Sequence, residues 1–342
     1  MKKEKKEKKK WTKKKKIIVF SIVGVLVALL LVNAIILPIT AKHDRKGSEE
    51  TPKTNEHIQE VPAISAHRAG GGEAPEQTLS AFKLCLESTD YEVDILEFDL
   101  HITKDEQLIL LHDDTLDRTS NAVEKYGRKD VKASELTLAE ILELNMGESF
   151  VHPETNETPY KGLRGEDIPS DVKILTLESI LDYVEKSAKT DGSMKYIIEI
   201  KDSGANGKKA MDKLYQTMVE YGIVNRTIIG TFNDDITKYL DEKYLDKITR
   251  SASIMEVLDF YFAFLYGDDL GEVKYSVLQI PYKAFIYNFG TKAIIDYAHS
   301  YGIATQFWTI NDAEQIAELQ ENGADAIITD YPSIAYEVIY GK

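Results

Sequence analysis

The sequence has a single cysteine, Cys85, among its 342 residues, which excludes an internal disulfide. Cys85 lies in the helix-like stretch AFKLCLES, where we interpret it as a small core residue. The sequence has no Cys/His cluster at zinc spacing and no strand followed by G-x-G-x-x-G. The GGG run at 70–72 lacks the Lys-Ser/Thr of a phosphate-binding P-loop. These absences argue against disulfide scaffolds, zinc fingers, dinucleotide-binding folds and P-loop proteins.

Charge is missing altogether from residues 17–40, which follow a head, residues 1–16, with eleven Lys and two Glu. At about 1.5 Å per helical residue, such a run is long enough to cross a hydrocarbon core of about 30 Å. We therefore predict an uncleaved transmembrane helix over 17–40, and a signal peptide cleaved near Ala41 is the alternative. The lysine head predicts a cytoplasmic N-terminus, a single-pass protein of the cell membrane and an extracytoplasmic location for residues 41–342.

Basic residues are scarce in the rest of the chain. The net charge is −15, and subtracting the +9 of the head (eleven Lys minus two Glu) leaves −24 for the remainder. This excess of acid argues against a nucleic-acid partner and against electrostatic docking on anionic lipid. Residues 41–60 are polar and have no apolar periodicity, so they are predicted to form a stalk before a domain at 61–342.

Short apolar runs alternate with amphipathic segments from residue 61 onward, a pattern that predicts a (β/α)₈ barrel. The predicted strands are 61–67, 95–103, 195–201, 226–232, 248–253, 276–281, 303–310 and 324–330. A doubly wound open sheet is the competing architecture. The region 114–175 is too long for an ordinary loop of about 2–6 residues, so we expect it to stand over the active-site rim. Within it, LTLAEILELNMG at 136–147 has helical periodicity.

Acidic and imidazole side chains gather around the second predicted strand. Glu97 and Asp99 are two apart, so they leave the same face of that strand. Two adjacent carboxylates repel each other unless a cation lies between them or one is protonated. His67 and His112 come just before and just after the strand, and imidazoles titrate near neutral pH. Metal-binding acids together with two proton-transfer groups are the parts needed to cleave a phosphate ester.

The carboxyl ends of barrel strands meet at one rim, where barrel enzymes place their chemistry. His67 closes the first predicted strand, and Glu199 and Lys201 close the third. These residues are therefore expected to converge with Glu97 and Asp99. Three acids against one lysine leave excess negative charge, which favours a hard, oxygen-seeking cation such as Ca²⁺ or Mg²⁺. The alternative is a buried salt bridge in which Lys201 neutralises the acids without any metal.

Several motifs follow one another in the order of one enzyme family. The stretches are HRAGGGEAPEQT, EFDLHITKDEQLILLHDDTLDRTS, LTLAEILELN, ILTLESIL, IIEIK, FWTIND and GADAIITDYP. Over residues 61–340 the sequence resembles the glycerophosphodiester phosphodiesterases, and with its predicted anchor a membrane-bound bacterial type. The resemblance implies a barrel that uses calcium or magnesium to hydrolyse glycerophosphodiesters to sn-glycerol 3-phosphate and an alcohol.

The resemblance also implies a role for each matching residue. It implies acid–base catalysis by His67 and His112, metal binding by Glu97, Asp99 and Glu199, and substrate binding by Arg68, Lys201 and Trp308. Two positions depart from the family pattern. Ala69 stands where the family usually has Gly, and Gln77 replaces the usual Asn of Pro-Glu-Asn-Thr. Asp113 and Arg118 are interpreted as solvated or turn-bracing, and Glu76 as a support of the first loop.

Two further functions stay open beside hydrolysis of small glycerophosphodiesters. The same reaction could act on lysophospholipids or on glycerophosphate polymers of a cell wall. A non-catalytic barrel that binds phosphodiesters is the third reading, and it predicts missing ligands or histidines, whereas here none is missing. The sequence leaves open which histidine is the acid, and whether water or the glycerol 2-hydroxyl attacks phosphorus.

Overall fold

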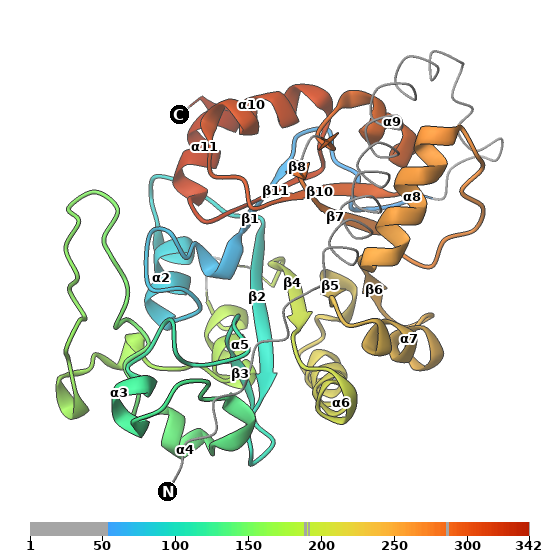
Figure 1. The fold of residues 1–342 in the computed structure, drawn as a ribbon. Helices are drawn as coiled ribbons and strands as arrows, with labels where there is room; N and C mark the ends of the chain where they lie inside the picture. The colour runs from blue at the N-terminus through green and yellow to red at the C-terminus, as the bar shows by residue number, and fades with distance from the viewer. Residues whose placement is uncertain (1–53, 188–189, 191, 285–286, 342) are drawn as a thin grey trace, which may run out of the picture.

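The computed structural model describes residues 54–187, 190, 192–284 and 287–341, and eight parallel strands form its centre (Figure 1). The strands are β1 (Ala63–Ala66), β2 (Ile95–Ile102), β4 (Lys195–Ile200), β5 (Thr227–Gly230), β6 (Thr249–Arg250), β7 (Val277–Pro281), β10 (Ala304–Trp308) and β11 (Ala326–Thr329). Each falls within a segment that the sequence predicts to be a strand. The eight predicted strands are therefore confirmed.

The strands follow one another around a nearly closed barrel in the order β6-β5-β4-β2-β1-β11-β10-β7. A parallel bridge between Ser251 and Val277 brings the two ends of this order together. The register between β2 and β4 places Asp99 directly beside Glu199. The predicted barrel is confirmed, and the open doubly wound sheet is excluded.

Helices cover the outside of the barrel. They are α2 (Leu79–Glu87), α5 (Leu177–Glu185), α6 (Gly204–Glu220), α7 (Asp234–Lys243), α8 (Ile254–Tyr266), α9 (Lys292–Ser300), α10 (Ala313–Asn322) and α11 (Pro332–Tyr340). Local signals set their ends. Reciprocal bonds between Ser253 and Glu256 form a capping box at the start of α8, and Gly267 adopts φ 70° after its last turn.

Alternation along the strands separates two apolar layers. Ile95 and Ile197 point into the barrel, where they belong to a small central cluster. Leu96 and Ile198 point outward into a much larger cluster shared with α2, α5 and α6. This period of two also explains why Glu97 and Asp99 face the barrel interior, since they share the parity of Ile95.

The long region between β2 and β4 forms a small subdomain beside the carboxyl end of β2 (Figure 1). It begins with β3 (Leu108–Leu110), which pairs antiparallel with the overhanging end of β2. It continues with α3 (Ala122–Tyr126) and α4 (Leu138–Ile141) and has an apolar cluster of its own. The helix predicted within 136–147 is thus a single turn. The remaining short elements are 3-10 turns at His67–Ala69, Ala133–Glu135, Gly165–Asp167, Ser170–Val172 and Val224–Arg226, and the hairpin of β8 (Lys283–Ala284) and β9 (Tyr287–Asn288).

Residues 54–60 pack across the amino-terminal end of the barrel, although the sequence predicts a stalk through residue 60. The Asn55 Nδ2 donates to the carbonyls of Ser276 and Gly302 at 2.7 and 2.9 Å. Ile58 packs against the central cluster of the barrel. Polar side chains at this point therefore satisfy strand ends, a role that hydropathy alone does not reveal.

The predicted membrane topology requires a correction. In the part of the chain that the structure describes, no helix has the length and apolar character needed to cross a bilayer. The predicted head at 1–16, span at 17–40 and stalk residues 41–53 lie outside the described residues. The predicted location, a single-pass protein of the cell membrane with an extracytoplasmic domain, is accordingly withdrawn.

Candidate active site

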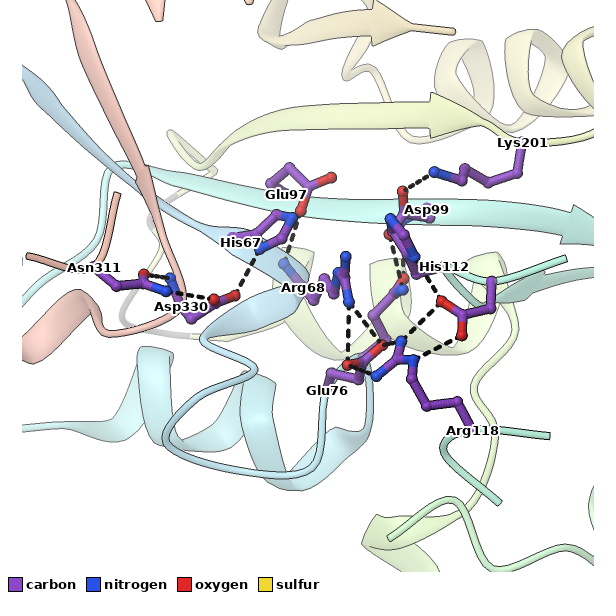
Figure 2. A network of polar contacts seen from close by, with 12 residues as sticks. His67, Arg68, Glu76, Glu97, Asp99, His112, Arg118, Lys201, Asn311 and Asp330 are labelled. Carbon is purple, nitrogen blue, oxygen red and sulfur yellow. Dashed lines mark hydrogen bonds and ion pairs between the residues drawn. The ribbon is translucent and has the colours of Figure 1, made fainter. Parts of the chain in front are cut away.

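Three acidic side chains meet at the carboxyl-terminal rim of the barrel, as the sequence predicts. Glu97 and Asp99 lie on β2 and are 5% and 1% exposed. Glu199, beside Asp99 in the register, comes from β4. The Lys201 ammonium lies 3.0 Å from Glu199 and 3.5 Å from Asp99. The structure therefore brings all four side chains together. Figure 2 shows three of them, Glu97, Asp99 and Lys201.

His67 lies directly after β1 and is held by an acid from the far end of the chain. Its Nδ1 lies 2.6 Å from a carboxylate oxygen of Asp330, which follows β11. Asn311 in turn donates to the other Asp330 oxygen at 2.7 Å. Burial lowers the pKa of His67, but the nearby charge of Glu97 and the bond to Asp330 outweigh it, so the pKa is raised. With Nδ1 engaged, Nε2 is the nitrogen left to face a substrate.

His112 has an analogous partner that is its neighbour in the sequence. Its Nδ1 lies 2.8 Å from Asp113, again leaving Nε2 for other contacts. Burial is the main reason that the pKa of His112 is lowered, although the charge of Asp99 acts in the opposite direction. Both histidines thus have an acid on Nδ1, which fixes the ring orientation.

The chain turns sharply at Arg68 and Ala69, whose φ angles are 52° and 60°. This turn aims the Arg68 backbone N–H at Glu97, to which it donates at 2.7 Å. A left-handed conformation costs a residue with a Cβ about 1–2 kcal/mol relative to glycine. The position of Ala69, where the family usually has Gly, is therefore one at which glycine is favoured on physical grounds.

Gln77 holds Asp99 from the other side. Its Nε2 donates to an Asp99 oxygen at 3.0 Å, and its Oε1 accepts from the Asp99 backbone N–H at 2.8 Å. Gln77 also has a left-handed backbone, with φ 55°. Asn adopts this conformation more readily than Gln, so the second departure from the family pattern keeps the polar amide at some conformational cost.

Aromatic rings border the site on the side of Lys201. Trp308 ends β10, and its ring packs edge-to-face on Phe232 at 5.8 Å between centroids. Phe232 is 50% exposed, and the Lys201 ammonium lies 5.9 Å from its ring. Trp308 therefore lies at the edge of the acidic cluster, where the sequence predicts a substrate contact, and Phe232 is an additional aromatic residue that the sequence analysis does not identify.

Crowding of the acids shifts their titration. Burial, reinforced by the charge of Asp99, raises the pKa of Glu97 to about 8 and that of Glu199 to about 7. Within the described residues, no group of three or more His, Cys, Asp or Glu side chains is already gathered closely enough to hold an ion. The donor chemistry nevertheless fits a hard cation, because three oxygen ligands carry more negative charge than Lys201 neutralises.

Several hydrogen-bond partners of the predicted site residues are not predicted from the sequence. Asp330 and Asn311 act on His67 from 263 and 244 positions away, and no local pattern connects them with it. Asp113 and Arg118 are interpreted from sequence as solvated or turn-bracing, yet Asp113 holds His112 and Arg118 bonds Asp113. Figure 2 shows the bonds of Arg118 to Glu76. One sequence signal could have pointed to Asp330. It directly follows a barrel strand, and Glu199 likewise lies at the carboxyl end of its strand, where barrel enzymes place functional residues.

A barrel whose rim combines buried acids, two imidazoles and cationic side chains is the arrangement expected of a hydrolase of phosphoric diesters. The model of the Glycerophosphoryl diester phosphodiesterase family matches residues 67–334. The chain belongs to this family and is an enzyme of that class. Family members generally depend on a divalent cation.

Similar proteins cover nearly the same part of the chain. A glycerophosphodiester phosphodiesterase of Bacillus subtilis is 28% identical over 286 residues, covering 81% of this chain and 86% of its own. One from Caldanaerobacter subterraneus subsp. tengcongensis is 26% identical over 278 residues, covering 81% and 97%. The structure of an Oleispira antarctica phosphodiesterase in complex with the product sn-glycerol-3-phosphate covers 82% of this chain and 97% of its own. Its TM-score is 0.60 at 20% identity, which supports the fold.

Proposed function

We propose that the protein hydrolyses glycerophosphodiesters to sn-glycerol 3-phosphate and an alcohol, with a divalent cation at the rim of the barrel. The observation that carries this proposal is the meeting of three acids, two imidazoles and two cationic side chains at one rim. A relative of the same fold has sn-glycerol-3-phosphate as its product. A non-catalytic barrel would not need to keep every one of these groups.

Glu97, Asp99 and Glu199 would hold the cation, for which Ca²⁺ and Mg²⁺ are the candidates because both prefer oxygen ligands. When bound, such an ion neutralises charge that develops on the phosphate oxygens. It would also relieve the crowding that raises the pKa values of Glu97 and Glu199, because both carboxylates would then be ionised beside a positive charge. The backbone N–H of Arg68 and the amide of Gln77 fix the orientation of Glu97 and Asp99.

The cationic side chains and the histidines supply the remaining chemistry. Arg68 and Lys201 neutralise non-bridging phosphate oxygens, where charge must be stabilised in the transition state. One imidazole removes the proton from the nucleophile, which is water or the glycerol 2-hydroxyl. Attack by the 2-hydroxyl gives a cyclic phosphate, which water then opens to glycerol 3-phosphate. The other donates a proton to the oxygen of the departing alcohol as its bond to phosphorus breaks. The nitrogen used in each case is Nε2, because Asp330 and Asp113 engage the two Nδ1 atoms.

Release of glycerol 3-phosphate from glycerophosphocholine by the purified full chain tests this function. Activity is expected with Ca²⁺ or Mg²⁺ and is expected to disappear with a chelator. A lysophospholipid and a glycerophosphate polymer, assayed alongside, distinguish the substrate classes. Phosphorus NMR during turnover would reveal a cyclic phosphate if the glycerol 2-hydroxyl attacks. Absence of hydrolysis with every substrate and both ions would refute the proposal.

A further inference from the structure

Arg118 connects the two sides of the site through four hydrogen bonds. Its Nε and Nη2 donate to the two oxygens of Asp113 at 2.7 and 2.9 Å. Its Nη1 and Nη2 donate to the two oxygens of Glu76 at 2.8 and 2.7 Å. A planar guanidinium is suited to bind carboxylates in pairs of parallel bonds. One side chain from the subdomain therefore grips two acids of the rim at once.

Each of these acids also contacts a residue with a proposed role in the reaction. Asp113 accepts from His112 at 2.8 Å, and Glu76 contacts the Arg68 Nη1 at 3.3 Å through both oxygens. The bonds from Arg118 to Glu76 are shorter by about half an ångström than those from Arg68. Glu76 is thus bound mainly by Arg118, and Arg68 is guided by Glu76 without being fully neutralised.

The Nε donor of Arg68 also indicates that Glu76 does not fully satisfy this side chain. Its Nε is buried and has no hydrogen-bond partner among the described residues. A buried N–H without an acceptor costs free energy unless something binds it. A phosphate oxygen of the substrate is an acceptor that would satisfy Arg68 while Glu76 is occupied by Arg118.

We infer that Arg118 is a positioning residue that orients His112 through Asp113 and Arg68 through Glu76. One guanidinium thus fixes the positions of both an acid–base group and a phosphate-binding group. Without Arg118, two carboxylates would lose their main partner. Glu76 would then pair fully with Arg68 and withdraw it from the phosphate, and the Asp113 carboxylate that holds His112 would be free to rotate. This inference rests on the proposed function, because it assigns Arg118 to the same reaction.

Replacement of Arg118 with alanine tests the inference against a matched control. Arg128 lies in the same subdomain, has the same 46% side-chain exposure and is paired with an acid, Glu135, away from the site. Arg118→Ala is expected to lower kcat/KM about 10²-fold, with kcat reduced through His112 and KM raised through Arg68. Arg128→Ala is expected to leave kcat and KM unchanged, while it changes the melting temperature about as much as Arg118→Ala does.

Three further measurements separate positioning from general stability. Because Arg118 is half exposed, millimolar guanidinium chloride should partly restore kcat of Arg118→Ala, whereas sodium chloride at equal ionic strength should not. Arg118→Lys keeps the charge but lacks the paired donors, so most of the loss should persist. Arg118→Ala combined with Asp113→Asn and Glu76→Gln should cost little more than Arg118→Ala alone.

Three outcomes would overturn the inference: wild-type kcat/KM in Arg118→Ala, full activity in Arg118→Lys, or a loss that guanidinium does not relieve. If the wild-type chain hydrolyses no glycerophosphodiester, the proposed function fails instead. The wild-type assay therefore distinguishes the two failures.

Discussion

The two ends of the barrel both bury acidic side chains, but they treat the charge in opposite ways. At the amino-terminal end, Asp325 is 1% exposed and accepts from the backbone of Gln59 and Thr305 at 2.8 and 2.6 Å. Its second oxygen also accepts from the Thr305 hydroxyl and faces His299 at 2.8 Å. Every oxygen there has protein partners. This end of the barrel is therefore expected to serve stability.

At the carboxyl-terminal rim, three acids share one lysine, and the pKa values of Glu97 and Glu199 rise as a result. Residues with a Cβ adopt left-handed φ angles at Arg68, Ala69 and Gln77 in order to hold this cluster. Strain and uncompensated charge persist where surrounding structure enforces them, and they concentrate at functional sites. In this barrel a buried acid with complete hydrogen bonds is therefore expected to serve stability, and buried acids with charge left over are expected to serve the proposed chemistry.

The largest expected effect is on activity at the rim. His67→Ala and His112→Ala should each lower kcat by about 10²–10⁴-fold, the usual loss for an acid–base group. Both variants should stay folded, and thermal unfolding should change less in His112→Ala, because the His112 side chain is 30% exposed and that of His67 only 14%. Steady-state kinetics and calorimetry on the same samples provide the test. Near-normal turnover in either variant would remove that histidine from the proposed mechanism.

The next largest effect is on stability, at the amino-terminal end of the barrel. Asp325→Ala leaves the backbone donors of Gln59 and Thr305 unpaired, so the free energy of unfolding should fall by about 2–5 kcal/mol. Turnover should be retained at temperatures where the variant is folded. Asp182→Ala, which removes an exposed acid paired with Lys186, is the control and should lower the free energy of unfolding far less, because water screens the pair. Equal costs in chemical denaturation would contradict the contrast between the two ends.

A third experiment asks whether the rim is under electrostatic strain. Because burial and Asp99 raise the pKa of Glu97 to about 8, the folded chain favours the protonated carboxyl. In the presence of a chelator, wild type should therefore lose stability relative to Glu97→Gln as the pH rises from about 4.5 towards 8. Denaturant titrations across this range measure the difference, and Glu242→Gln, at an exposed position, is the control. A difference that does not grow with pH would show that the acids are not strained.

The smallest expected effect is on the pH dependence of stability and concerns His57 at the amino-terminal end of the barrel. Burial lowers the pKa of His57 below its ordinary value of 6.5, so the folded chain favours the neutral ring. Stability should decline as the pH falls below 6.5, because the unfolded chain takes up the proton first. His57→Gln should reduce this acid sensitivity of the melting temperature. Identical pH profiles for the two proteins would show that His57 does not contribute.

The sequence predicts much of the barrel and less of the site. The strands were predictable because apolar runs such as KYIIEIK and ADAIITD are local signals with turn residues around them. The convergence of Glu97, Asp99, Glu199 and Lys201 follows from strand parity and from the common rim. These residues lie together in the structure, and their roles stay predictions.

What the sequence does not predict depends on contacts between distant segments. His67 and Asp330 pair although they are 263 positions apart in the sequence, and the four bonds of Arg118 depend on how the subdomain docks. From sequence, residues 54–60 are predicted to be part of a polar stalk. In the structure, Asn55 donates hydrogen bonds to backbone carbonyls at the starts of two strands, a contact that hydropathy does not reveal. Such roles require geometry that local propensity does not encode.

The most direct test of the account is the binding of Ca²⁺ or Mg²⁺ to the rim, measured by titration calorimetry on the full chain after chelator treatment. We predict that one ion binds per chain, that binding is lost in Asp99→Asn, and that it is retained in Glu242→Gln. No binding by wild type, or unchanged binding by Asp99→Asn, would contradict the claim that excess negative charge at the rim serves a cation.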